Sequence, residues 1–303
     1  MNLLASLIPS FLFIGVLFIP TFSILKFYDY KNRTKKSPLN IDLLRNPGQT
    51  LQKEIDELTN DLSANLAILP IIPVLLYSYT LSAYQFNTTK PSIFVIIFFI
   101  FIGLISIFYF TIKNFKILNK RNKLRLAHEC EVFVGQDLQN SLINGFKIFH
   151  DFPANNFNID HVAIGPSGVF AIETKGRAKA RKSENKNWVV TFDGENLIFP
   201  GWQEKEPIIQ ATRQAKWLEK WIQESTAEKI HVTPVLALPG WFIERRAKSN
   251  LIIYNGKNSN FLEKNSAILS RKQIDIISFQ IEKACRNIEG KSYQKIMKPS
   301  TSN

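Results

Sequence analysis

The chain has 303 residues and a formal net charge of +13, from 38 Lys and Arg against 25 Asp and Glu. This positive excess favours an anionic partner, nucleic acid or a membrane surface, without distinguishing the two. The two cysteines, Cys130 and Cys285, lie far apart in the chain, which excludes a disulfide framework and a cysteine-rich metal site and fits a reducing compartment.

Three long uncharged stretches in the first 112 residues predict a membrane region of three transmembrane helices. They cover 3–25, 65–86 and 91–112, and each has about the length that crosses a bilayer as a helix, roughly 20 residues. Residues 94–110 are apolar all round, and such a helix requires lipid or complete burial. A cleaved signal peptide is the alternative for the first stretch. Because residues 1–4 carry no Lys or Arg, we expect a retained helix there.

The basic residues predict one orientation for all three helices. Residues 26–64 and the segment after 112 are rich in Lys and Arg, whereas the loop between the second and third stretches offers only Lys90. Since positive loops stay in the cytoplasm, the amino terminus is expected outside and everything after 112 inside. Residues 113–126 form a basic juxtamembrane linker, which anchors to lipid headgroups or guides nucleic acid toward a neighbouring site.

Residues 127–290 have the pattern of a soluble mixed α/β domain, followed by a tail over 291–303. Helices are expected over 129–144, 207–224 and 270–288, and strands over 146–152, 159–164, 169–175, 188–192, 230–238 and 251–254. This order predicts one mixed sheet flanked by helices. A short amphipathic helix is also expected over 51–62, with no chemistry assigned to it.

The segment NIDHVAIGPSGVFAIETKG, residues 158–176, reads as two strands joined by a tight turn. A two-residue loop, Pro166-Ser167, would place Asp160 directly opposite Glu173. A type I turn with Gly168 in a bulge suits proline better, but it shifts the register by one residue and then requires a kink near Asp160. The sequence leaves both registers open.

The charged residues of this hairpin are typical of a metal-dependent hydrolase. Glu173 and Lys175 are two apart on one strand and therefore share a face. Asp160 and Glu173 together suit one Mg²⁺ or Mn²⁺ ion, and Lys175 suits the positioning of an attacking water. A solvated surface hairpin with a cross-strand ion pair is the alternative from spacing alone.

Four segments resemble the NERD (nuclease-related) domain, which is placed with the PD-(D/E)xK nuclease-like superfamily. They are the helix Glu131–Leu138, the run Ile159-Asp160-His161-Val162, the strand Gly168–Lys175 and the helix start Pro207–Gln214. The resemblance covers roughly residues 127–260. It implies an α/β (α+β), restriction-endonuclease-like mixed sheet, here preceded by the three transmembrane helices.

The resemblance also implies roles for individual residues. Asp160 and Glu173 would be metal ligands, Lys175 the catalytic lysine, Glu131 an additional acidic group, and Gln210 a contact to the site or the substrate backbone. The function implied is a membrane-anchored nuclease that depends on Mg²⁺ or Mn²⁺, acts on nucleic acid with DNA favoured over RNA, and sits in a bacterial inner membrane as a multi-pass protein with a cytoplasmic domain. The alternative is a non-catalytic module that binds nucleic acid or protein at the membrane.

Residues beside the hairpin leave two further readings open. The basic loop 175–187 is either solvated or tracks phosphates next to the site. Trp188, Trp202, Trp217 and Trp221 are expected in or near the core, with base stacking by Trp202 as the alternative. His161 is expected to face away from Asp160 and to pack or hydrogen-bond there.

Overall fold

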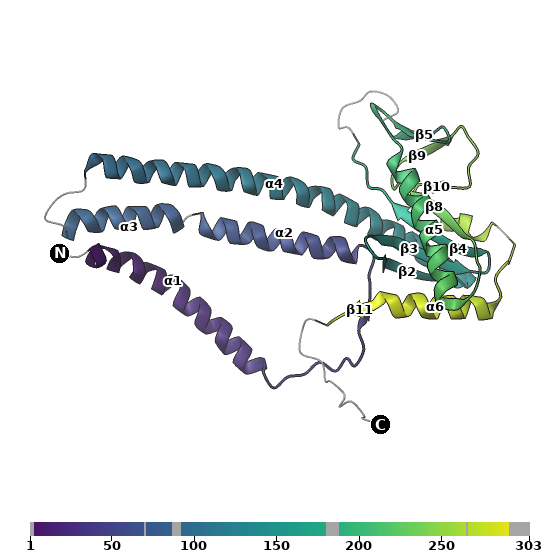
Figure 1. The fold of residues 1–303 in the computed structure, drawn as a ribbon, viewed down its shortest axis with the longest axis horizontal. Coiled ribbons are helices and arrows are strands. Elements are labelled where there is room, and N and C mark those ends of the chain that lie inside the picture. Colours follow the sequence, from purple (N-terminus) through teal and green to yellow (C-terminus); the bar gives the residue numbers. More distant parts are fainter. Residues whose placement is uncertain (1–2, 70, 87–91, 180–187, 265, 291–303) are drawn as a thin grey trace. The chain divides into compact units, whose positions relative to one another are not determined.

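The computed structural model describes residues 3–69, 71–86, 92–179, 188–264 and 266–290 (Figure 1). The described chain forms two compact units. The second consists of Ile41–Ile55 and Lys123–Glu289, and the other described residues make up the first. The second unit thus includes a segment, 41–55, that the sequence placed in the membrane region. The predicted tail 291–303 lies outside the described residues.

The first unit is helical. It contains α1 (Leu3–Asn32), α3 (Ile71–Phe86) and most of α2 (Gln49–Ile68) and α4 (Ile93–Gln139). Among the described residues, two helical stretches are long and apolar enough to cross a membrane, Gln49–Ser82 and Ile93–Asn144. Only 7% and 6% of their most apolar parts are buried, unlike the core helix of a soluble protein. The predicted span 3–25 lies within α1, and its membrane role stays a prediction.

The basic segment 113–126 is part of α4, which runs from Ile93 to Gln139 without a break. No Gly or Pro occurs between Gly103 and Gly135, so nothing in the sequence stops the helix. The helix expected over 129–144 is therefore the end of a longer one, followed by the 3-10 helix η1 (Asn140–Asn144). The amphipathic helix expected over 51–62 lies within α2.

The main sheet of the second unit has five strands in the order β10-β8-β4-β3-β2. These are β2 (Lys147–Pro153), β3 (Asn158–Gly165), β4 (Gly168–Thr174), β8 (Val232–Ala237) and β10 (Ile252–Tyr254). β3 runs antiparallel to both of its neighbours, β2 and β4. On the other side of β4, β8 runs parallel to β4 and β10 runs parallel to β8. The prediction of a mixed sheet is confirmed.

Alternate residues of β4 pack on opposite faces of this sheet. Val169 and Ala171 join the core formed with α5 (Glu206–Thr226) and α6 (Arg271–Cys285). Phe170 and Ile172 join the core that contains Val134 and Leu138 of α4. The sheet is therefore covered by helices on both faces. Glu173 follows Val169 and Ala171 at the same two-residue spacing, so its side chain also faces α5.

A second, four-stranded sheet was not predicted. Its order is β7-β6-β5-β9, formed by β5 (Val189–Phe192), β6 (Leu197–Phe199), β7 (Trp202–Glu204) and β9 (Phe242–Arg245). Its strand β5 was expected, as 188–192, but β6, β7 and β9 carry too little alternation to be recognised from sequence. The expectation of a single sheet is corrected: the described residues form a five-stranded sheet, a four-stranded sheet and a two-stranded pairing.

A two-stranded antiparallel sheet joins the segment 41–55 to the chain that follows the last helix. β1 (Leu43–Leu44) lies antiparallel to β11 (Arg286–Ile288), so the last helix ends at Cys285 and not at 288. The helix start is as expected. Ser270 caps it in a reciprocal capping box with Gln273.

The hairpin follows the register of a two-residue loop. Gly165 pairs with Gly168 and His161 with Ile172, so the register shifted by a bulge is wrong. The turn is held from outside: the carbonyl oxygen of Pro166 accepts the N–H groups of Ile268 and Leu269. These contacts explain how a proline is accommodated in a loop that free hairpins avoid.

Candidate nuclease-like site

The carboxylate of Glu173 lies at the end of β4 and is held on both oxygens. Its side chain is 3% exposed. Oε1 accepts from Lys175 Nζ at 2.6 Å and from Gln210 Nε2 at 2.7 Å, and Oε2 accepts from Gln214 Nε2 at 2.6 Å. The helix α5 thus approaches the strand end with two amides, and the lysine predicted to share a face with Glu173 contacts it directly.

Asp160 lies beside Glu173 on the neighbouring strand. The observed register, continued by one pair, places it opposite Glu173, and its Oδ2 accepts the N–H of Thr174 at 2.6 Å. Burial raises the pKa of Asp160 well above its usual range, and the charges of Glu173 and Glu131 add to this effect. The carboxylates predicted as a pair are together.

Glu131 enters from α4 and is buried, at 7% exposure. Burial raises its pKa to about 8, helped by the negative charges of Asp151 and Glu173. The charge of Lys175 and a hydrogen bond from the backbone N–H of Gly48 act in the opposite direction. A carboxyl with a pKa near neutrality at the end of a sheet is typical of functional sites.

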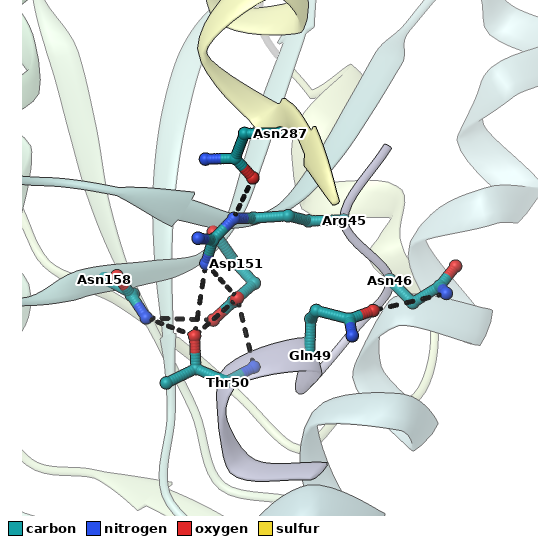
Figure 2. A network of polar contacts seen from close by, with 7 residues as sticks. All are labelled: Arg45, Asn46, Gln49, Thr50, Asp151, Asn158 and Asn287. Carbon is teal, nitrogen blue, oxygen red and sulfur yellow. Dashed lines mark hydrogen bonds and ion pairs between the residues drawn. The ribbon is translucent and has the colours of Figure 1, made fainter. Parts of the chain in front are cut away.

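The segment 41–55 makes polar contacts with β2 and β3, next to the site residues (Figure 2). Arg45 Nη1 lies 2.6 Å from Oδ2 of Asp151, which also accepts from the Thr50 hydroxyl at 2.7 Å and the Thr50 N–H at 3.1 Å. Asn158 Nδ2 donates to the Thr50 hydroxyl oxygen at 2.7 Å, and the Asn158 carbonyl oxygen lies 3.2 Å from Gln214 Nε2. A hydrogen-bonded chain therefore runs from Arg45 to the amide that holds Glu173.

Sequence reasoning missed Gln214 and this segment. Gln214 stands four residues after Gln210, on the same helix face, so its spacing was an available signal. Segment 41–55 had none, because its contacts are with residues far away in the chain. The strand β2 is also distorted at this point, with Asp151 at φ 49°.

A divalent cation fits the donors of the site only in part. Three acidic side chains, those of Glu131, Asp160 and Glu173, face one lysine, and their oxygens are the type of ligand that Mg²⁺ or Mn²⁺ prefers. The carbonyl oxygen Oε1 of Gln214 is buried without a hydrogen-bond partner among the described residues, as expected beside a hydrated ion. Within the described part of the chain, however, no three His, Cys, Asp or Glu side chains are close enough to form a ready metal site.

His161 follows Asp160 on β3 and therefore lies on the opposite face of the sheet. His161 Nδ1 lies 2.9 Å from His150 Nδ1, across the β2–β3 pair. Burial lowers the pKa of His150 to about 4 and that of His161 well below its usual range. Both are therefore neutral at pH 7, and His161 makes the hydrogen bond expected of a packing histidine.

The described part of the basic loop begins with two anchored cations. Arg177 binds Glu204 through two hydrogen bonds of 2.8 and 2.6 Å, and Lys179 Nζ donates to the carbonyl oxygen of Gly240 at 2.6 Å. Residues 180–187, the rest of the predicted phosphate-tracking loop, lie outside the described residues.

The mixed α/β domain thus carries two adjacent carboxyl groups and a lysine at the ends of neighbouring strands. Residues 126–239 match the family model described as the nuclease-related domain (NERD). This part of the chain is a nuclease-related domain, and it contains all five site residues predicted from the sequence. No match was found among curated proteins or among solved structures.

Proposed function

We propose that the protein is a membrane-anchored nuclease that hydrolyses phosphodiester bonds of nucleic acid with the help of Mg²⁺ or Mn²⁺. The observation that carries the proposal is the Glu173 carboxylate, held by Lys175, Gln210 and Gln214 beside Asp160 within a nuclease-related domain. We assign the domain a restriction-endonuclease-like fold, in keeping with the antiparallel β2–β3–β4 meander that continues into parallel β8.

In this proposal, Asp160 and Glu173 hold the cation, with Glu131 close by. When bound, the cation supplies positive charge for the scissile phosphate and lowers the pKa of a water molecule. Gln210 and Gln214 keep the Glu173 carboxylate oriented, because each amide N–H can only donate and each carboxylate oxygen can only accept.

Lys175 has two tasks. Its ammonium group orients the attacking water next to Glu173, and it stabilises the negative charge that grows on the phosphate oxygens. The water oxygen bonds to phosphorus, the bond from phosphorus to the leaving oxygen breaks, and the water proton passes to solvent or to a neighbouring carboxylate. Lys175 is 22% exposed, so substrate reaches it from outside.

The proposed location is a bacterial inner membrane, with the amino terminus outside and the nuclease-related domain in the cytoplasm. It is supported by the exposed apolar surface of α3 and α4 and by the basic flanks of the apolar stretches. Fluorescence of a green fluorescent protein fused after Asn303 tests the orientation. A dark fusion, together with an active alkaline phosphatase fusion at the same position, would reverse it.

A cleavage assay on the full-length protein in detergent tests the enzymatic proposal. Single-stranded DNA, duplex DNA and RNA are compared with Mg²⁺, Mn²⁺ or EDTA, and DNA is the substrate we favour. Glu173→Gln and Lys175→Met are expected to lower the rate by at least about 100-fold. The matched control is Glu224→Gln on the exposed side of α5. Cleavage that persists in both site variants would overturn the assignment.

A non-catalytic nucleic-acid-binding or protein-binding module is the second candidate. It is favoured by the Lys175–Glu173 ion pair, which occupies a carboxylate oxygen that a metal needs, and by the lack of a ready three-ligand metal group among the described residues. It predicts salt-sensitive binding that is unchanged by EDTA and never followed by cleavage.

A further inference from the structure

A hollow lies beside the candidate site, where the chain leaves the main sheet. It has a volume of about 240 Å³ and is lined by Lys179, Trp188, Gly240, Trp241, Phe242, Asn255 and Lys257. Three of these seven residues are aromatic and two are lysines. This combination, ring faces next to ammonium groups, suits a nucleobase joined to a phosphate.

Two of the rings are open to solvent. Trp188 is 49% exposed and Phe242 is 53% exposed, and their ring centroids lie 5.4 Å apart in an edge-to-face arrangement. The backbone N–H of Phe242 donates to the carbonyl oxygen of Trp188 at 2.7 Å, which fixes the spacing of the two side chains. Trp241, which lines the same hollow, is buried and packs edge-to-face on Phe199. The hollow therefore combines two exposed rings with one that is fixed in the core.

A second hollow extends the positive charge along β9. It has a volume of about 530 Å³ and is lined by Arg245, Arg246, Ala247, Lys248 and Ser249. The strand β9 connects the two hollows, because Phe242 at its start lines the first hollow and Arg245 at its end lines the second. Of the described residues, no Asp or Glu lines either hollow, and Glu244 between them binds Arg246 at 3.2 Å. A four-residue strand spans about 10–13 Å.

The first hollow is joined directly to the candidate site. The N–H of Lys175 donates to the carbonyl oxygen of Ala237, the last residue of β8, and Gly240 follows three residues later. Trp241 Nε1 donates to the carbonyl oxygen of Arg177 at 3.1 Å, two residues after Lys175. Both chain segments that leave the site thus form walls of the hollow.

We propose that the surface formed by these two hollows, from Lys179 to Lys248, binds a single strand of nucleic acid and leads it to Glu173 and Lys175. A base stacks on Trp188 and Phe242, and the lysines and arginines bind the phosphates on either side. Single strands expose the ring faces of their bases, whereas a duplex hides them, so the occupant is single-stranded. The proposal rests on nucleic acid being the partner of the candidate site.

Binding without turnover tests this surface. Fluorescence anisotropy of labelled oligo-dT is measured with the full-length protein in detergent, at low salt and in EDTA, so that cleavage plays no part. Trp188→Leu and Phe242→Leu, which keep an apolar side chain, are each expected to weaken binding by about tenfold. Lys257→Gln and Lys248→Gln are expected to weaken binding. Each should also reduce the slope of log affinity against log salt concentration by about one, because one phosphate contact is lost.

Matched controls lie on α6. Phe279→Leu replaces a ring that is 65% exposed, and Lys272→Gln removes an exposed lysine; both are expected to bind as the wild type does. Wild-type affinity in the Trp188 and Phe242 variants, with unchanged thermal unfolding, would overturn the proposal, and so would the absence of oligo-dT binding by the wild type. Weakened binding by those variants supports it even if the wild type never cleaves, which separates it from the proposed nuclease activity.

Discussion

Gln214 donates its side-chain amide to Oε2 of Glu173 at 2.6 Å while only 1% of its surface is exposed. The same nitrogen lies 3.2 Å from the carbonyl oxygen of Asn158. The position of Glu173 is therefore set by a core residue of α5 as well as by Lys175 and Gln210 at the edge. A carboxylate held on both oxygens keeps its orientation when substrate and ions exchange around it.

Replacing Gln214 should impair the site more than it impairs the fold. Gln214→Leu removes the donor to Oε2 of Glu173, and we expect cleavage to fall by about 10–100-fold, with a destabilisation of about 1–3 kcal/mol. Cleavage rates and thermal unfolding of the full-length protein check this. Gln223→Leu, an exposed position on the same helix, is the control. Equal rates for the two variants would show that Gln214 does not position Glu173.

The Arg45–Asp151 ion pair should contribute more to stability than the exposed Lys147–Asp275 ion pair of the same unit. Its side chains are 17% and 5% exposed, whereas those of Lys147 and Asp275 are 46% and 55% exposed. Removal of Arg45 leaves the Asp151 carboxylate buried without its cation, so Arg45→Ala is expected to cost about 2–3 kcal/mol, against less than about 1 kcal/mol for Lys147→Ala.

Thermal unfolding of the two variants and of Arg45→Ala/Asp151→Asn measures this difference. The double variant is expected to recover part of the loss, because it removes the unpaired charge as well. We also expect Arg45→Ala to slow cleavage, since the chain of contacts from Arg45 ends at Gln214 and Glu173. Equal shifts in melting temperature for Arg45→Ala and Lys147→Ala would contradict the structural reasoning.

The parts of the fold that sequence predicted well are those with strong local signals. The nearly continuous apolar runs of β3 and β4 and the Ser270 cap of α6 each have a local pattern, and so does the shared face of Glu173 and Lys175. The register of the hairpin was not decidable locally. Pro166 disfavours a two-residue loop by itself, and the contacts from Ile268 and Leu269 that hold the loop are distant in sequence.

The missed features depend on long-range contacts. β1 has two residues and forms only because it pairs with β11, and β6, β7 and β9 are nearly as short. Gly48 and Thr50 contact Glu131 and Asp151 through a backbone N–H and a hydroxyl, groups that no periodicity can mark as functional. The five residues predicted for the site stay a prediction, and the contacts that hold them could not be read from the sequence.

Gly48 should tolerate substitution less well than another glycine with a similar backbone. Its φ is +67°, and a Cβ there would lie 2.6 Å from Cδ2 of His128. Gly145 has φ +82° and a Cβ there would meet nothing closer than 3.9 Å. Both alanine variants bear the cost of a left-handed backbone, about 1–2 kcal/mol.

In Gly48→Ala the new Cβ must also displace the His128 ring or the Gly48 backbone, and with it the N–H group that binds Glu131. We therefore expect the melting temperature of Gly48→Ala to fall several degrees below that of Gly145→Ala, with slower cleavage in Gly48→Ala alone. Indistinguishable melting curves and rates would show that the 41–55 segment does not depend on this close approach.

Protonation of His150 should reduce stability in mild acid, whereas Glu131, with its raised pKa, acts in the opposite direction. Burial lowers its pKa to about 4, from an ordinary value near 6.5. Between these values the unfolded chain binds a proton at this residue that the folded chain does not, so unfolding becomes more favourable as the pH falls from about 6.5 to 4. The contribution is present in full above pH 6.5, is lost as the pH falls to about 4, and amounts to about 3 kcal/mol. His161 is the group that faces His150 from the neighbouring strand, through a 2.9 Å contact. Between pH 7.5 and pH 4.5 the melting temperature should therefore fall less, or rise more, for His150→Gln than for the wild type. Equal slopes for the wild type and His150→Gln would mean that His150 takes up its proton in the folded state as readily as in the unfolded chain.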